Sequence, residues 1–222
     1  MKNINWLDHI ANLLVVILGI SIAFYLESYK EEASNKQQEL KYLESMITDL
    51  ESDVEALDTL LIINEDISES LINLSMASVG RPYGTDSALM FQTLKIQYNP
   101  PFSPQRTTYE SLKASGKMDL INDFELRNSI VDLYEQFYRG TNEYDAAINE
   151  HVRDFIKPYY MKNVRFTGAQ SIDPSFLSNN EFRNMIFAYR YLFVAKDNFY
   201  RTVKQQADSL KSELITYQSG FN

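Results

Sequence analysis

Apolar residues follow one another from Ile10 to Leu26, and only Asn12 and Ser21 interrupt this run with polar side chains. A bilayer core of about 30 Å needs roughly 20 residues of helix, and the residues from Trp6 onward extend the run to that length. The pattern therefore predicts a transmembrane anchor, with its short N-terminal tail, over residues 1–30. Nothing else in the sequence has the length and apolar character to cross a bilayer.

A cleaved secretory signal is the alternative interpretation of this run, because Ser21-Ile22-Ala23 offers small residues at the spacing that a signal peptidase prefers. The basic region before the run, however, consists of Lys2 and the amino terminus alone, and the helical pattern continues through Ala23. We therefore expect the segment to be retained as an anchor.

One face of the anchor helix carries its small and polar residues. At about 100° per residue, the following positions share one stripe: Asp8, Asn12, Val15, Gly19, Ala23 and Leu26. Gly19 and Ala23 allow a second helix to approach closely, and Asn12 can form a hydrogen bond across such a contact. The stripe predicts a helix-packing or oligomerisation face. The alternative is that small residues are merely common in membrane helices and that Asp8 lies among the lipid headgroups.

The helix is expected to continue beyond the membrane as a stalk over residues 31–78, because no Gly or Pro occurs between Gly19 and Gly80. Apolar positions alternate at three and four residues along a seam, which Asn64 then interrupts: Leu40, Leu43, Ile47, Leu50, Val54, Leu57, Leu61 and Asn64. Such a seam is typical of coiled coils and long bundles, and a polar residue within it fixes the register. We expect the seam to continue the partner face of the anchor, although it could equally pack within the chain.

Short helices are predicted at 86–97 and 108–115, separated by the proline-rich connector Asn99–Pro104. Long helices are predicted at 123–157 and 179–217, the first ending before Pro158 and bending at Gly140. The apolar stripe of the first long helix includes Phe137 and Phe155, and residues 159–178 are expected to form a loop. Three polar residues, each followed three positions later by Glu, mark the expected helix N-caps: Thr107, Asn122 and Ser178.

These elements predict an all-α fold, because seven Gly and six Pro are few for a fold with many tight turns. A single transmembrane helix continues into the stalk helix, which packs with the two further long helices as an antiparallel bundle. The chain is thus divided into the anchor and a helical bundle domain over residues 31–222.

Charge and residue types exclude several function classes. The net charge of -9 argues against a nucleic-acid partner, which requires a basic surface, and the absence of Cys excludes disulfides and thiolate metal sites. His151 lies on an apolar stripe, where we expect a core residue, and the acidic residues around Asp145 are more typical of a solvated face than of a cation site. Since no catalytic motif is present, we expect no enzyme, no cofactor and no metal.

Three stretches resemble an uncharacterised family of small membrane-anchored bacterial proteins, common in Bacteroidota and known as a domain of unknown function. They are Asn12–Ala23 in the anchor, Glu39–Leu50 in the stalk, and Thr108–Ile121 leading to Glu125–Arg127. The resemblance covers the first two thirds of the chain better than the last third. Similar proteins tend to carry an acidic residue at the position of Asn12 and a longer basic segment before the anchor.

The resemblance implies the bacterial inner membrane, crossed once, with the bundle outside the cytoplasm. A count of positive charge opposes this orientation slightly, because Lys30, Lys36 and Lys41 follow the anchor whereas Lys2 alone precedes it. The function that we predict is a non-enzymatic interaction or scaffold module in contact with membrane lipid, which associates with itself or serves as accessory subunit of another membrane protein. The alternatives are a sensory bundle that binds a ligand and signals through a partner, and a subunit of an ion-driven complex.

Overall fold

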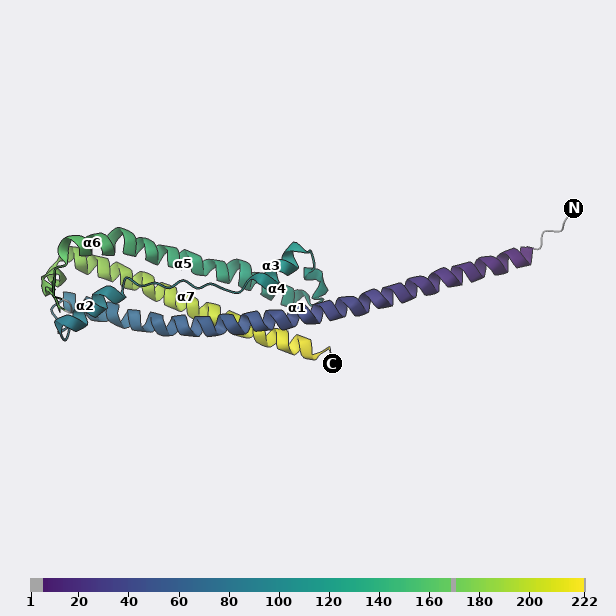
Figure 1. Ribbon diagram of the computed structural model, residues 1–222, viewed down its shortest axis with the longest axis horizontal. Coiled ribbons are helices and arrows are strands. Elements are labelled where there is room, and N and C mark those ends of the chain that lie inside the picture. The colour runs from purple at the N-terminus through teal and green to yellow at the C-terminus, as the bar shows by residue number, and fades with distance from the viewer. Residues whose placement is uncertain (1–5, 169–170, 222) are drawn as a thin grey trace.

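The computed structural model describes residues 6–168 and 171–221, and their side chains from residue 12 onward. One helix, α1 (Trp6–Ser78), runs for 73 residues, which corresponds to about 110 Å at 1.5 Å per residue. Its C-terminal half lies within a helical bundle, and its N-terminal part projects from the bundle alone (Figure 1). The fold is all-α, as predicted from the spacing of apolar residues.

Two further long helical segments complete the bundle. One is built from α4 (Phe124–Asp132), α5 (Tyr138–His151) and α6 (Lys157–Asn163), which two π-helical turns join into a continuous run; the other is α7 (Asn180–Ser219). Helix α7 packs along α1 and also against α5. The remaining elements are α2 (Asp86–Lys95), α3 (Thr107–Ala114), the 3₁₀ turns η1 (Met118–Leu120) and η4 (Pro174–Ser178), and the short strands β1 (Phe166–Gly168) and β2 (Ser171–Ile172).

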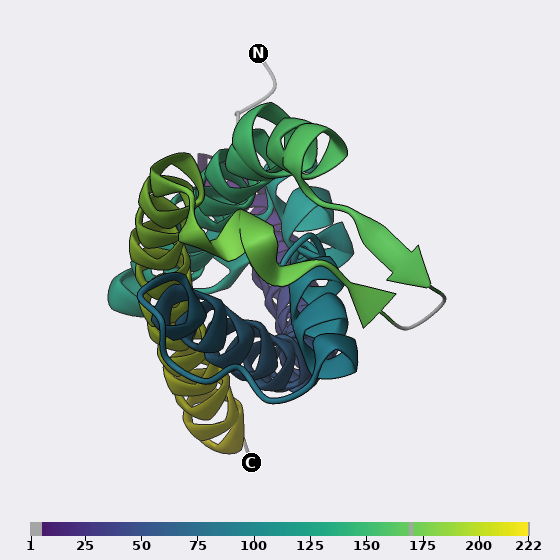
Figure 2. The same cartoon turned by 90° about the vertical axis from the view of Figure 1, so that its left-hand side faces the viewer.

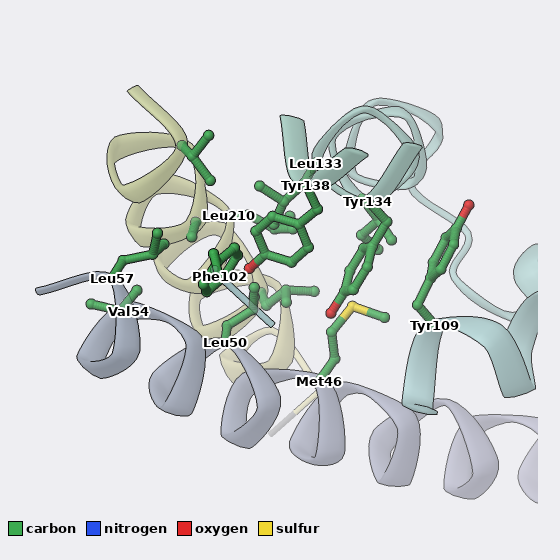
Figure 3. Close-up of a cluster of buried hydrophobic side chains, with 14 of the residues drawn as sticks. Met46, Leu50, Val54, Leu57, Phe102, Tyr109, Leu133, Tyr134, Tyr138 and Leu210 are labelled. Carbon is green, nitrogen blue, oxygen red and sulfur yellow. The ribbon is translucent and has the colours of Figure 1, made fainter. Parts of the chain in front are cut away.

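The core consists of two clusters stacked along the bundle. The cluster nearer the anchor joins the seam of α1 to aromatic residues of the second helical run, as Leu50, Leu57, Tyr134 and Tyr138 show in Figure 3. The distal cluster joins the end of α1 to α2, α6 and α7. Asn64 is fully buried in α1 near the boundary between the clusters, and its amide has no hydrogen-bond partner in the described part of the chain.

The π-helical turns η2 (Leu133–Phe137) and η3 (Val152–Ile156) change which residues face the core. A π turn adds one residue, so the buried position moves one residue along the sequence. Phe137 is only half-buried while Tyr138 is buried, and Phe155 is 57% exposed while Ile156 is fully buried. The expectation that Phe155 lies on the core stripe is therefore wrong, whereas Phe137 packs at the edge of the core cluster nearer the anchor.

The second π turn also explains why Pro158 does not end the helix, as had been expected. Pro158 occupies the first turn of α6, directly after η3, where the helical hydrogen-bond register changes. A proline has no N–H to donate and is tolerated at such a start. The bend expected at Gly140 stays a prediction; a Cβ at this position would lie 2.6 Å from the Phe199 ring, so glycine permits close packing of α5 on α7.

The predicted N-caps are displaced by one residue or lack their hydrogen bond. Asp123 and Asn179 cap α4 and α7 through their side chains, in place of Asn122 and Ser178. Helix α3 begins at Thr107 itself, after Arg106 and without a side-chain cap. Residues 159–178 were expected to be a loop but contain α6, the antiparallel pair β1–β2 and η4, which lie across the distal end of the bundle (Figure 2).

Candidate functional site: the uncovered anchor helix

The apolar segment of α1 is not covered by the bundle. Side chains from Asn12 to Leu26 are all exposed, and α1 is the one helix of the described chain that is long and apolar enough to cross a membrane. An exposed apolar surface of this extent is rare on soluble proteins and is compatible with a surrounding lipid phase.

The stripe of small and polar residues faces away from the bundle. Ser28 lines a cavity at the base of the bundle, between α1, η1 and the end of α7, and thereby marks the bundle side of α1. Gly19 lies nine residues before Ser28, which is two and a half helical turns, and Ala23 and Leu26 lie about 140° and 160° from Ser28. Asn12 and Val15 belong to the same outer side, whereas the side chain of Asp8 lies outside the described residues.

The seam of α1 packs inside the chain's own bundle and is not available to a partner. Leu43, Leu50, Leu57 and Asn64 are fully buried, and Val54 and Leu61 are nearly so. Leu40 and Ile47, nearer the edge of the packed region, are half-buried. The seam was expected either to meet a partner or to pack within the chain, and the structure shows that it packs within the chain.

The expectation of one continuous face from anchor to seam is therefore wrong. Steps of three and four residues average 3.5, so a stripe built from them drifts by about 20° per heptad on a straight helix of 3.6 residues per turn. Five heptads separate Gly19 from Val54, which amounts to about 100° of drift. The anchor stripe and the seam consequently look in different directions.

The base cavity, of about 840 Å³, holds the contacts that fix α1 where it leaves the bundle. The Tyr217 hydroxyl donates to Glu39 Oε1 at 2.8 Å, and Glu39 is only 3% exposed. Lys36 donates to the Phe221 carbonyl at 3.4 Å, and its ammonium lies 5.3 Å from the Phe221 ring centroid. The C-terminal end of α7 is thus attached to α1 next to the anchor.

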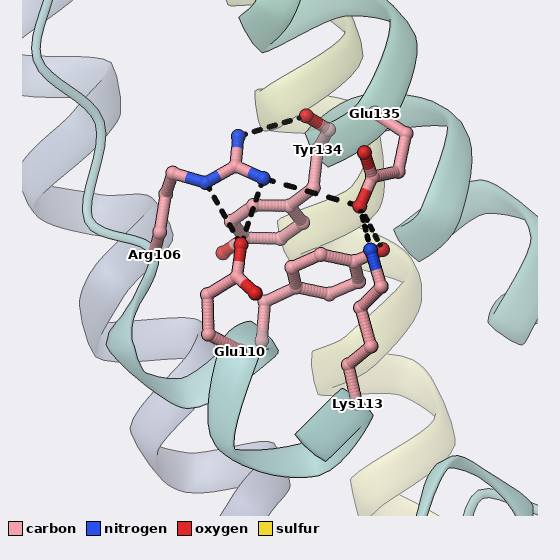
Figure 4. Close-up of polar contacts among 6 residues, drawn as sticks. Arg106, Glu110, Lys113, Tyr134 and Glu135 are labelled. Carbon is pink, nitrogen blue, oxygen red and sulfur yellow. Dashed lines mark hydrogen bonds and ion pairs between the residues drawn. The ribbon is translucent and has the colours of Figure 1, made fainter.

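A second polar cluster attaches α3 to the π turn η2 (Figure 4). Arg106 donates to Glu110 at 2.9 Å and to the Tyr134 carbonyl at 3.0 Å, and Glu135 accepts from the Tyr109 hydroxyl at 2.8 Å. The hydrogen bond from Lys113 holds the pKa of Glu135 below its usual value. The Tyr109 and Tyr134 rings stack with centroids 4.4 Å apart, so polar and aromatic contacts together hold α3 against η2.

A buried ion pair joins α5 and α7. Lys196 is fully buried, with Nζ 3.1 Å from Asp145 Oδ1, and the Tyr200 hydroxyl donates to Asp145 Oδ2 at 2.7 Å. Lys196 also donates to Asn99 Oδ1, at the start of the proline-rich connector. Burial lowers the pKa of the Lys196 ammonium, while the neighbouring Asp145 opposes this change.

Sequence reasoning missed this pair and the burial of Asp145. Its signal was the position of Lys196 between Phe193 and Tyr200, on a stripe that is otherwise apolar. The other acidic residues of the region do not gather around Asp145: Glu143 and Glu150 are exposed, and Asp154 pairs with Arg153 at 2.7 Å. Within residues 12–168 and 171–221, no group of three His, Asp or Glu side chains is placed to hold a metal ion.

A second buried carboxylate, Asp53 of α1, binds the end of the connector. Asp53 Oδ1 accepts the Gln105 N–H at 2.8 Å, and Oδ2 has no partner in the described part of the chain. Burial raises the pKa of Asp53 to about 6, and the hydrogen bond from Gln105 offsets part of this rise. The ionised form of this side chain is therefore disfavoured in the folded protein.

Substituting Lys196→Met is expected to lower the free energy of unfolding by about 3–5 kcal/mol, because it leaves the Asp145 carboxylate buried without a counter-charge. Adding Asp145→Asn should restore at least half of the loss. Urea denaturation of the full chain in mild detergent, followed by circular dichroism, measures both. Lys41→Met, at an exposed lysine of α1, serves as control and should change stability by less than about 0.5 kcal/mol. Equal losses in the single and double variants would contradict the role of the pair.

Asp53→Asn is expected to change how stability depends on pH. Because the pKa is near 6 in the folded state and 3.8 without burial, the folded wild type binds more protons between these values. Its free energy of unfolding should therefore fall as the pH rises from about 4 to 6, by up to about 3 kcal/mol from this group alone. The variant lacks this contribution, so its stability relative to wild type should increase over that range and level off above it. A difference that is constant with pH would refute this role of Asp53.

Comparison with known proteins supports the resemblance found in the sequence and extends it into the last third of the chain. No curated protein and no solved structure matches the chain. The model of a family described as "Family of unknown function (DUF6090)" matches residues 12–200, from the anchor to the middle of α7. The resemblance to an uncharacterised family is thus confirmed, whereas its distribution in Bacteroidota stays a prediction. Because the match covers more than four fifths of the sequence, the chain belongs to this family of unknown function.

Proposed function

We propose that this protein is a non-enzymatic scaffold module, held in the bacterial inner membrane by the N-terminal part of α1. Its anchor associates with a second copy or with another membrane protein through the stripe Asp8, Asn12, Val15, Gly19, Ala23 and Leu26. The observation that carries the proposal is that the apolar segment of α1 is wholly uncovered and turns this stripe away from the bundle.

The position of the stripe makes such an association sterically simple. Two helices that meet at Gly19 place their bundles on the outer sides of the pair, since each bundle lies on the opposite side of its own α1. Close approach of the backbones at small residues, with a hydrogen bond from Asn12, supplies the attraction that apolar side chains cannot provide within lipid.

Beyond the membrane, the same side of α1 carries the exposed Lys30 and Lys41 first and is acidic after them. Glu44, Glu51 and Glu55 are exposed and lie 16, 23 and 27 residues after Ser28, which places them opposite to Ser28 as well. Two copies that met along this side would bring like charges together, which is unfavourable. A pair of identical chains therefore makes contact within the membrane, and a partner that extends along the outer side of α1 would need to be basic.

Replacing Gly19 by Leu is expected to weaken the association at least about tenfold, which corresponds to about 1.4 kcal/mol, because the added side chain separates the two backbones. Crosslinking and mass measurement in mild detergent, after purification from native membrane, measure the change. Ile17→Leu puts the same residue on the bundle side of the helix and serves as the matched control. A wild-type protein that is monomeric without a co-purifying partner, or equal behaviour of the two variants, would overturn the proposal.

We further propose that the bundle lies outside the cytoplasm. Protease added to intact spheroplasts should then digest residues beyond about Lys30, and the same protease added to inverted inner-membrane vesicles should leave them protected. Immunoblotting with an antibody against the bundle distinguishes the cases. Protection in spheroplasts together with digestion in inverted vesicles would establish the opposite orientation.

A further inference from the structure

The distal half of the bundle contains a mostly apolar cavity far from the anchor. It has a volume of about 660 Å³ and lies between η3 and α6 on one side and α7 on the other. Its apolar lining comes from Phe155, Pro158, Met185 and Ala188, while Lys162, Glu181 and Asn184 contribute polar groups. This size and mixture are typical of sites for small molecules.

His151 is the buried polar group of this lining, at 8% exposure. Its Nε2 lies 3.1 Å from the Met185 carbonyl oxygen. Because a carbonyl can only accept, Nε2 must carry the hydrogen. Burial lowers the pKa of His151 below its usual value, which favours the neutral ring. In this tautomer Nδ1 bears a free lone pair and is a hydrogen-bond acceptor.

No residue of the described chain donates to His151 Nδ1. Nδ1 is also not among the fully buried side-chain atoms of the described chain that lack a partner, so it keeps some contact with solvent. Since the residue lines the cavity, the atom remains open to a donor that enters it. A bound molecule with a suitably placed N–H or O–H group can therefore donate a hydrogen bond to this unused acceptor.

The π turn η3 places an aromatic ring next to this acceptor. The ring of Phe155 is 5.2 Å from that of His151, centroid to centroid, and Phe155 is more than half exposed because the added residue of the π turn moves it off the core stripe. The Tyr189 ring also lies against the imidazole, 5.1 Å away from centroid to centroid, and helps to hold it in place. π turns inside α-helices occur frequently at functional sites.

We propose that this cavity binds a small, flat, mostly apolar molecule with one N–H or O–H group, which donates to His151 Nδ1 while the flat body lies against Phe155. The site is independent of the anchor stripe and adds a ligand-binding function to the scaffold. Recognition rests on a single directed hydrogen bond within an otherwise apolar contact.

Indole and 1-methylindole are suitable probes, because they share a flat apolar shape and differ in the N–H donor. Ligand-observed NMR titration of the full chain in lipid nanodiscs, with empty nanodiscs as reference, gives the two dissociation constants. Indole should bind at least about fivefold more tightly, since the hydrogen bond to Nδ1 is lost with 1-methylindole. In His151→Phe the two probes should bind equally, and circular dichroism shows whether this variant retains its helical content.

Blocking the cavity provides a test that does not depend on His151. Ala188→Trp fills the cavity from an exposed position of α7 and should abolish saturable binding, whereas Ala146→Trp, at an exposed position of α5 outside the lining, should leave it unchanged. A ¹⁵N-labelled sample reports the acceptor directly, because the chain contains only two histidines. The Nδ1 resonance of His151 should shift on addition of indole but not of 1-methylindole. Absence of saturable binding, equal affinities in the wild type, or wild-type binding by Ala188→Trp would each overturn the proposal.

Discussion

An uninterrupted α1 exposes apolar side chains at its N-terminal end and packs into a protein core at its other end. Within one helix, the two ends use residues on different sides: Gly19 and Ala23 look outward, and Leu50 and Leu57 look into the bundle. Helix α7 makes this possible, because it covers the inner side of α1 and is bound to it at the exit point through Tyr217 and Glu39. Most other elements pack against these two helices, whereas β1 pairs with β2 and β2 lies against α2.

The proline-rich connector illustrates how the bundle satisfies polar backbone groups in its interior. Three prolines remove donors from this segment. The Phe102 N–H is bound by the Tyr200 hydroxyl, and the N–H of Gln105, directly after the connector, is bound by Asp53. Asn99 is bound by the buried Lys196. Phe102 itself is buried against Tyr138. The buried charges of the protein thus hold an extended segment in one register along the helices, at the expense of burying ionisable groups.

The sequence was sufficient to predict the helical class, the long α1 and the apolar seam, because a 3.5-residue period over many turns has few alternative explanations. It was insufficient at the π turns. The single residue that each π turn adds makes Tyr138 face the core in place of Phe137, and Ile156 in place of Phe155. No local property of these residues indicates this change. Lys196 was missed for a related reason: a charged side chain on an apolar stripe is acceptable only when a partner such as Asp145 arrives from another helix. The direction of the anchor stripe likewise required knowledge of where the bundle lies around α1.

The absence of any loop between the anchor and the bundle has a mechanical consequence. Within the described residues, α1 passes from Leu26 to Ser78 as one helix, a length of about 80 Å at 1.5 Å per residue. With the anchor in a membrane, as proposed, such an element would act as a lever: a change of about 10° in its tilt at Leu26 would carry the distal end through about 14 Å. In that proposed arrangement, a small change of tilt within the membrane would displace the cavity at His151 by a large distance, and motion of the distal end would tilt the anchor.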